Sequence, residues 1–317
     1  MIKTPQEAAQ TEYFGRALVA LGEQYKDLVV LDPDVHSSTK TQYFSEKYPD
    51  RFIEIGISEQ DMIGIAAGLA ASGKIPVASG FATFVIGRTW EQVANSVARP
   101  ALNVKIVGTH AGLSASSDGG SHQPIGDVAL MRVLPNIKVV VPADGPEAGE
   151  AITALVKDRG PSYLRLNRGS TPVVYDGGCD FRLGEVKTLR DGSDAAIIAN
   201  GIMVSMALQA AELLAVDNVD ARVINLHTVK PLDGRAVEKV AQETGAIVTA
   251  EEHSIIGGLG GAVAEILAES RPTPVRRVGV MDHFGASSRS YSDLLVRVGL
   301  TPEAIVDAVQ DVMKRRN

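Results

Sequence analysis

Short runs of β-branched residues alternate with longer stretches of helical periodicity along nearly the whole 317-residue chain. This alternation is typical of βα units, in which helices cover a parallel sheet. The strands expected in the first half are Leu28–Asp32, Phe52–Ile57, Ile75–Ser79, Val104–Thr109, Lys138–Val141 and Ser162–Leu166. The helices expected between them include Asp61–Ala71, Glu91–Val97 and Pro146–Lys157. The pattern therefore predicts an α/β fold.

A change of composition divides the chain into two such series. Residues 167–194 are rich in Gly, Asp and Pro without a sustained helical period, which indicates a linker that carries a short strand. Further strands are expected at Ala195–Asn200, Ala221–Leu226, Ala246–Ala250 and Val275–Val280, with helices at Met203–Leu214, Arg235–Glu243, Gly261–Glu269 and Thr301–Lys314. We expect two doubly wound domains, residues 1–178 and a smaller one at 195–317, joined by a linker at 179–194.

Composition and charge exclude several classes of partner. Lys and Arg number 31 against 38 Asp and Glu, a net charge of -7 without a basic stripe, so neither nucleic acid nor a membrane is an expected partner. The single cysteine, Cys179, cannot form an internal disulfide, which fits a reducing compartment. Residues 1–10 lack the apolar core of a signal peptide, and no apolar stretch of about 18 residues occurs. We expect a cytoplasmic protein.

Glu59 is the first candidate for a functional residue. It follows the strand expected at Phe52–Ile57 and opens a helix, with Ser58 as the expected N-cap and Asp61 completing a pair like a capping box. A carboxylate at this position either complements the helix dipole or lies buried and faces the crevice outside the strand ends. Spacing alone leaves both interpretations open.

Glycines mark close packing rather than a phosphate-binding loop. Gly64 and Gly68 are expected to let the helix that Glu59 opens lie close to its sheet, and Gly73 to end it in a left-handed conformation. The run Gly257–Gly261 comes near a dinucleotide-binding motif but lacks the final glycine. Tight packing at a helix start is the better interpretation of that run.

Two aromatic residues follow the strand expected at Ile75–Ser79. Phe81 and Phe84 lie three residues apart, in a chain with only 5% aromatic residues. They form either a stacking surface for a flat heterocycle or part of the core. Arg88 follows them, just before the lone Trp90.

A polar loop of small residues follows the strand at Val104–Thr109 and carries His110, Asp118 and His122. Two histidines and an aspartate on a loop at a strand exit favour contacts with a polar substrate. Their spacing is not that of a zinc site, so no metal ligand is assigned in this chain.

Other strand ends carry further polar residues. Arg168 follows the strand at Ser162–Leu166, and Ser38 follows the strand at Leu28–Asp32. An arginine and a hydroxyl there suit a phosphate or carboxylate, although solvated loop residues look the same. The polar residues 251–253 follow a strand of the second domain and are interpreted as interface or structural residues.

Taken together, these segments resemble the transketolase family of thiamine-diphosphate enzymes, and more narrowly its carboxyl-terminal half encoded as a separate subunit. The motifs that carry the resemblance are LDPDVHSST (31–39), PDRFIEIGISEQDMIGIAAGLA (49–70), SGFATF (79–84), VGTHAGLSASSDGGSHQP (107–124), VVVPADG (139–145), INLHTVKPLD (224–233) and TAEEHSIIGGLGGAVAE (249–265). The resemblance implies a pyrimidine-binding domain followed by a transketolase C-terminal domain.

The resemblance also implies roles for the candidate residues. Glu59 matches the glutamate that hydrogen-bonds the aminopyrimidine of the cofactor and so activates it, and the aromatic pair matches the rings that pack on the pyrimidine. Sugar and phosphate contacts are implied for Ser38, His110, Asp118, His122 and Arg168, and His122 matches a family residue that lies beside the reacting carbons of the donor.

The chain departs from the family pattern in three ways. The family's Gly-Asp-Gly…Asn motif for diphosphate and Mg²⁺ is absent, so a partner N-terminal subunit should hold these groups in a shared site. Gln10, Thr11 and Glu12 stand where complete transketolases carry a phosphate-clamping arginine, and Glu12 is expected to repel phosphate. Ser117 replaces a usual glutamate and Gly120 a usual proline.

The resulting hypothesis is a transketolase subunit that is active only with its partner, in a heterotetramer where this chain also associates with itself. It would move a two-carbon ketol unit from a ketose to an aldose, either of which could carry phosphate. Two alternatives share a glutamate like Glu59: the β subunit of a 2-oxo acid dehydrogenase and an enzyme like deoxyxylulose-phosphate synthase. A non-catalytic regulatory subunit of a thiamine enzyme is a third.

Overall fold

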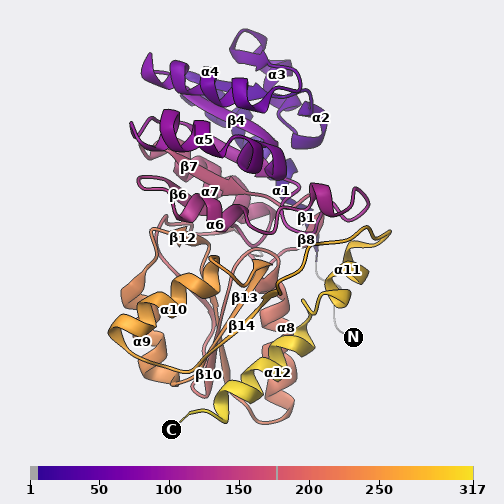
Figure 1. The fold of residues 1–317 in the computed structure, drawn as a ribbon, viewed down its shortest axis with the longest axis vertical. Coiled ribbons are helices and arrows are strands. Elements are labelled where there is room, and N and C mark those ends of the chain that lie inside the picture. Colours follow the sequence, from indigo (N-terminus) through magenta and orange to yellow (C-terminus); the bar gives the residue numbers. More distant parts are fainter. Residues whose placement is uncertain (1–5, 176–177, 317) are drawn as a thin grey trace.

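The structure, a computed structural model, describes residues 6–175 and 178–316. The first half of the segment at 1–10 discussed above therefore lies outside the described residues. Two sheets, each covered by helices on both faces, lie one above the other in Figure 1. Most neighbouring strands are parallel, which confirms the expected α/β fold.

The first sheet has the strand order β12-β6-β7-β5-β4-β2-β3. Its strands are β2 (Leu28–Asp32), β3 (Phe52–Glu54), β4 (Ile75–Phe81), β5 (Lys105–Thr109), β6 (Lys138–Val140), β7 (Ser162–Arg165) and β12 (Thr228–Lys230). All neighbours are parallel except β12, which pairs antiparallel with β6. The carboxyl ends of the six parallel strands therefore meet at one edge of the sheet.

Helices bury apolar residues against both faces of this sheet. One face packs against α1 (Gln10–Gln24), α3 (Gln42–Lys47) and α7 (Gly145–Lys157), which contribute Phe14, Phe44 and Ile152 to one core. The other face packs against α4 (Glu59–Ala71), α5 (Trp90–Gln92) and α6 (Asp127–Arg132) and the π-helical segments Thr83–Arg88 and Val93–Ala98. No helix was expected at Gln10–Gln24.

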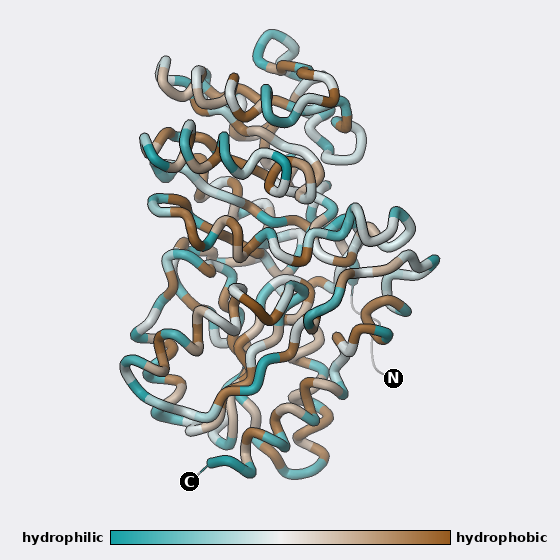
Figure 2. Tube along the Cα trace, viewed as in Figure 1, coloured by the Kyte–Doolittle hydropathy of each residue, from teal (hydrophilic) through white to brown (hydrophobic). Residues whose placement is uncertain are grey.

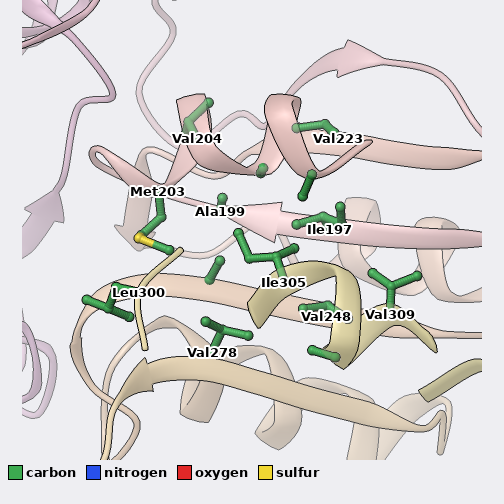
Figure 3. Close-up of a cluster of buried hydrophobic side chains, with 14 of the residues drawn as sticks. Ile197, Ala199, Met203, Val204, Val223, Val248, Val278, Leu300, Ile305 and Val309 are labelled. Carbon is green, nitrogen blue, oxygen red and sulfur yellow. The ribbon is translucent and has the colours of Figure 1, made fainter. Parts of the chain in front are cut away.

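The second sheet has the strand order β14-β13-β10-β11-β9. Its strands are β9 (Lys187–Arg190), β10 (Ala195–Ala199), β11 (Ala221–Asn225), β13 (Ile247–Ser254) and β14 (Val275–Val280). Helices α8 (Met203–Val216) and α12 (Pro302–Met313) cover one face, where Figure 3 shows Met203, Val248 and Ile305 in the apolar core. Helices α9 (Gly234–Thr244) and α10 (Leu259–Ser270) cover the other face.

Three pairings made by short strands join distant parts of the chain. Strand β12 follows the second domain's β11 in sequence but completes the first sheet, which the sequence pattern did not predict. Strand β1 (Glu7–Ala9) pairs with β8 (Ser170–Pro172), and β9, within the stretch assigned to the linker, pairs antiparallel with β11. Helix α11 (Tyr291–Arg297) was also not expected.

The start of helix α4 differs in detail from expectation. Ser58 is the N-cap residue, but its side chain makes no capping hydrogen bond, so the predicted capping pair with Asp61 is wrong. The expected packing role of Gly64 and Gly68 is also wrong, because a Cβ atom at either would meet no atom within 4 Å. Gly73 has φ +91°, as predicted for the residue that ends this helix.

Hydropathy follows the layers of the fold. In Figure 2 the hydrophobic stretches concentrate in the strands and on inward helix faces, whereas the end of the chain after α12 is hydrophilic. Among the helices of residues 6–175 and 178–316, none combines the length and the apolar character needed to cross a membrane.

Candidate active site

The strand order of the first sheet explains how residues far apart in sequence meet. Strands β3, β2, β4, β5 and β7 are successive neighbours. The segments that leave their carboxyl ends carry, in the same order, Glu59, Ser38, the pair Phe81 and Phe84, the loop from His110 to His122, and Arg168. In open α/β sheets ligands bind outside the carboxyl ends of strands.

Glu59 is buried and has one strong partner. Its side chain is 5% exposed, and its Oε2 accepts a hydrogen bond of 2.7 Å from Nη1 of Arg88, whose side chain is 46% exposed. Within the part of the chain that the structure describes, Oε1 of Glu59 accepts no hydrogen bond. A buried carboxylate therefore keeps one oxygen available to a donor.

The rings of the candidate residues form a continuous cluster. The ring of Phe81 lies 4.0 Å from that of His110 and 6.4 Å from that of Phe84, between centroids. Phe84 in turn meets the ring of His122 edge-on at 5.2 Å, and the guanidinium of Arg88 lies 4.7 Å from its centroid. Both phenylalanines are only half-buried, so they form a surface and not part of the core.

His110 is held in an unusual state at the end of β5. Its φ of +56° is in the left-handed region, which costs a non-glycine residue on the order of 1 kcal/mol. Burial and the nearby Arg168 lower the pKa of His110 to about 4. The imidazole is therefore neutral at pH 7 and can donate one hydrogen bond while it accepts another.

Asp118 and Arg168 form an ion pair at the rim of the site. Nη1 of Arg168 lies 3.0 Å from Oδ2 of Asp118 and also donates to Oγ of Ser117 at 3.3 Å. All three side chains are exposed. A surface ion pair of this kind is worth about 0–1 kcal/mol, so either partner can exchange it for a substrate group.

Ser38 is not brought into this cluster. It lies exposed on the short helix α2 (His36–Thr39), and among the described residues its hydroxyl has no hydrogen bond to Arg168 or His110. Asp32, His36 and Glu54 meet beside it, with ligand atoms within 4.8 Å of one another. Both carboxylates of that trio already accept backbone N–H groups, so the trio is explained by turn structure.

Glu12 differs from expectation in its charge environment. Its carboxylate binds Nζ of Lys40 at 3.2 Å and accepts a hydrogen bond of 2.8 Å from the hydroxyl of Tyr43. Lys40 offsets the negative charge of Glu12, which weakens the expected repulsion of phosphate; the repulsion itself stays a prediction. Neighbouring Gln10 is buried, where it bonds Asn167 N–H and the carbonyl of Pro142.

Sequence reasoning gave Arg88 no role, although the structure places it between Glu59 and Phe84. A signal was present, since Arg88 follows Phe84 at four residues and the two side chains share one side of a helical turn. That turn, Thr83–Arg88, is π-helical. Single π-helical turns are frequent at functional sites.

Comparison with known proteins identifies the family. Residues 6–173 match the family model "Transketolase, pyrimidine binding domain", and residues 184–305 match "Transketolase, C-terminal domain". The chain belongs to the transketolase family. It is a split subunit of these thiamine-diphosphate enzymes, corresponding to their carboxyl-terminal section.

Three relatives illustrate the match to transketolases. A "Putative transketolase C-terminal section" from Methanocaldococcus jannaschii is 43% identical over 95% of both chains. A subunit of a 6-deoxy-6-sulfo-D-fructose transketolase from a Clostridium species is 44% identical over 92% of this chain and 90% of its own. A solved "Split gene transketolase, inactive beta4 tetramer" is 46% identical and superimposes with a TM-score of 0.91 over 98% of this chain and 99% of its own.

The residues present fit the pyrimidine end of the family's cofactor. Glu59 offers the free oxygen Oε1 to an N–H donor. Arg88, which donates to Oε2 of Glu59, also lies over the half-buried ring of Phe84, whose neighbour is Phe81. A carboxylate acceptor next to aromatic faces suits a flat heterocycle that carries a ring N–H. Because the diphosphate motif is absent from the sequence, the fit extends to the pyrimidine alone.

Proposed function

We infer that this chain is the C-terminal subunit of a thiamine-diphosphate-dependent transketolase, active only with a partner subunit. In this proposal it transfers a two-carbon ketol unit from a ketose or ketose phosphate to an aldose or aldose phosphate. The observation that carries the proposal is the free oxygen of buried Glu59, which Arg88 connects to the Phe81–Phe84 surface. A non-catalytic regulatory chain needs neither feature.

Each residue of the cluster has a task in this proposal. Thiamine diphosphate, held with Mg²⁺ mainly by the partner, supplies the nucleophilic carbon and the electron sink for cleaving the ketose. Glu59 accepts a hydrogen bond from the aminopyrimidine, and burial strengthens that bond because no water competes. Phe81 and Phe84 pack on the pyrimidine face.

In this proposal the loop after β5 binds the sugar substrates. His110 is neutral at pH 7, so it can orient hydroxyl groups without adding charge. His122 lies against Phe84, and in this proposal it moves a proton at a donor hydroxyl. Arg168 gives up its ion pair with Asp118 and binds a phosphate or another anionic group. Asp118 then accepts a hydrogen bond from a hydroxyl of the acceptor. Ser38 lies outside this cluster of side chains, and its contact with phosphate stays a prediction.

Two observations support a site shared with a partner and self-association of this chain. Ile57, two residues before Glu59, is a large apolar side chain that is 75% exposed. An exposed apolar side chain next to a buried functional carboxylate suits a surface that another subunit covers. The similar split-gene protein is described as an inactive tetramer of one kind of chain, which supports self-association of this chain; the heterotetramer with a partner subunit is part of the proposal.

Calorimetric titration tests the proposal. Thiamine diphosphate and Mg²⁺ are titrated into the chain alone and into its mixture with an N-terminal transketolase section. We expect saturable binding only in the mixture, followed by ketol transfer between sugars of a donor and acceptor panel. Turnover of pyruvate with glyceraldehyde phosphate, but not of ketose donors, would instead favour a synthase, and tight binding by the chain alone would refute the shared site.

A further inference from the structure

The loop that carries the sugar contacts has little structure of its own. Between β5 and α6, residues 110–126 contain only the 3₁₀ turn Gly120–His122. We call this segment the β5–α6 loop. Its exposed tip holds Asp118, which must stay aligned with Arg168 and His122 to act on one substrate. An unsupported loop of this length would sample many conformations.

The second domain holds both ends of this loop. At the first end, Leu113 N–H donates to Oε1 of Glu252 at 2.7 Å, and the Leu113 side chain is buried in the second domain's core. At the other end, Ser254 N–H donates to the carbonyl of Ile125 at 2.7 Å. Glu252 and Ser254 both lie on β13, so one strand fixes both ends of the loop.

A second segment of the same domain supports the middle of the loop. Residues 281–290, between β14 and α11, are here called the β14–α11 segment. Ser288 N–H donates to the carbonyl of Ser116 at 2.8 Å. The side-chain amide of Gln123 donates to the carbonyl of Ala286 at 3.0 Å and approaches that of Ala115 at 3.4 Å. In Figure 1 this yellow segment lies against the magenta loop.

The contact is close enough to require glycine on both sides. A Cβ atom at Gly120 would lie 2.8 Å from the carbonyl oxygen of Gly285. A Cβ atom at Gly285 would lie 1.8 Å from Oε1 of Gln123, which is itself buried. Such backbone proximity indicates a fixed register between loop and segment. It also gives a physical reason for Gly120, where the family usually has proline.

Glu252 also connects these loop contacts to strand β7, which ends at Arg165. Its Oε1 also accepts a hydrogen bond of 2.7 Å from the hydroxyl of Tyr291, and its carbonyl accepts one of 2.8 Å from Arg165. Arg165 ends β7, three residues before Arg168. Asn167 donates to the same Tyr291 hydroxyl at 2.9 Å. The second domain therefore touches both segments that supply the ion pair at the rim of the site.

We propose that the second domain positions the sugar-binding loop, with Gln123 and Glu252 as positioning residues for Asp118 and His122. The proposal rests on the proposed function and gives the second domain a task in substrate binding. Gln123 touches no reacting group here. It acts by joining the loop to the β14–α11 segment, directly beside His122.

The first test is kinetic and uses the complex with the N-terminal subunit. Gln123→Met keeps the side-chain length but removes both donors. We expect the KM for the sugar acceptor to rise about tenfold, equivalent to about 1.4 kcal/mol, while the KM for thiamine diphosphate changes less than about twofold. Gln242→Met, at an exposed position of α9, is the matched control.

The second test needs no cofactor, partner or activity. Amide hydrogen exchange is measured on the isolated chain, and peptides covering 112–123 should exchange about tenfold faster in Gln123→Met than in the control. Tyr291→Phe, which removes only a hydroxyl, provides a second variant with the same expected direction should Gln123→Met fold poorly.

The outcomes separate this proposal from the proposed function. Unchanged loop exchange together with an unchanged sugar KM would overturn the positioning role, as would equal increases in the KM for sugar and cofactor. If the wild-type complex transfers no ketol unit, the proposed function fails, and the exchange experiment alone then decides whether the second domain orders the loop.

Discussion

The two domains share one architecture but use the ends of their strands differently. In the first domain, polar atoms beyond the strands remain available, as with Oε1 of Glu59 and Nε2 of His110, whose Nδ1 contacts the hydroxyl of Thr109. In the second domain, the corresponding atoms bond back to this chain. Asn225 at the end of β11 donates to Glu147, and Glu252 on β13 accepts from Leu113 N–H. Although the two folds are similar, the first domain thus provides the reactive surface and the second domain supports it.

The largest expected effect comes from removing a support contact. Glu252→Ala deletes the acceptor for Leu113 N–H and Tyr291 and leaves Arg165 with one fewer buried partner. Breaking such a buried network costs about 3–5 kcal/mol in the free energy of unfolding. Urea denaturation measures this, with Glu265→Ala as control, since exposed Glu265 pairs with Arg132 at the surface. A loss below about 1 kcal/mol, similar to the control, would contradict the supporting role of the second domain.

The contact between the two domains at Glu147 is expected to make the stability of the fold depend on pH. Burial raises the pKa of Glu147 to about 7 from its ordinary 4.5, although the hydrogen bonds that its carboxylate accepts from Ala143 N–H and Asn225 act to lower the pKa. The folded chain therefore keeps a proton that the unfolded chain releases. The contribution of this bound proton to the stability of the fold is complete below pH 4.5, falls as the pH rises towards 7, and is lost above pH 7.

Glu147→Gln removes this titration. Its stability relative to wild type should improve by up to about 3 kcal/mol between pH 4.5 and pH 8, at about 1.36 kcal/mol per pKa unit. Unfolding curves across this range measure the difference. Glu150→Gln, on the exposed side of the same helix α7, controls for the loss of one carboxylate. Parallel pH profiles of Glu147→Gln and wild type would refute a proton-holding contact between the domains.

A smaller effect is expected from Arg88 in the first domain. Arg88 holds Oε2 of Glu59 and leaves Oε1 available. Arg88→Met should weaken the binding of thiamine diphosphate to the two-subunit complex by about three- to tenfold, because the carboxylate loses its orientation. Arg88→Lys should restore part of the affinity. Calorimetry measures both, and tighter binding by Arg88→Met would mean that Arg88 competes with the cofactor.

The sequence predicted elements best where burial is local and continuous. β2 begins and ends as expected and β10 ends one residue earlier than expected, because each is a continuously buried run of five residues. β12 was missed, because its three residues pair with β6 from the other side of the linker. The capping by Ser58 was predicted from residue type, yet its backbone at φ −145° and ψ 65° leaves the hydroxyl without a capping bond.

The site was predictable as a set of strand ends but not as a set of contacts. Every candidate follows a strand of the first sheet, which the alternation of strands and helices places at one edge. The ion pair of Glu59 with Arg88 depends on a π-helical turn, and the support of Gln123 on a segment over 160 residues later. Neither pairing leaves a periodic signal. The roles of the candidate residues remain predictions that mutation must test.

The most direct measurement of the central claim is ketol transfer by Glu59→Gln in complex with the N-terminal subunit. Wild-type and variant complexes are compared at saturating thiamine diphosphate and Mg²⁺, with assembly followed by light scattering. We predict that kcat falls at least about 100-fold while assembly is unchanged, since a neutral amide can accept a hydrogen bond but lacks the negative charge that stabilises a protonated ring nitrogen. A variant that assembles and retains wild-type kcat would contradict the account.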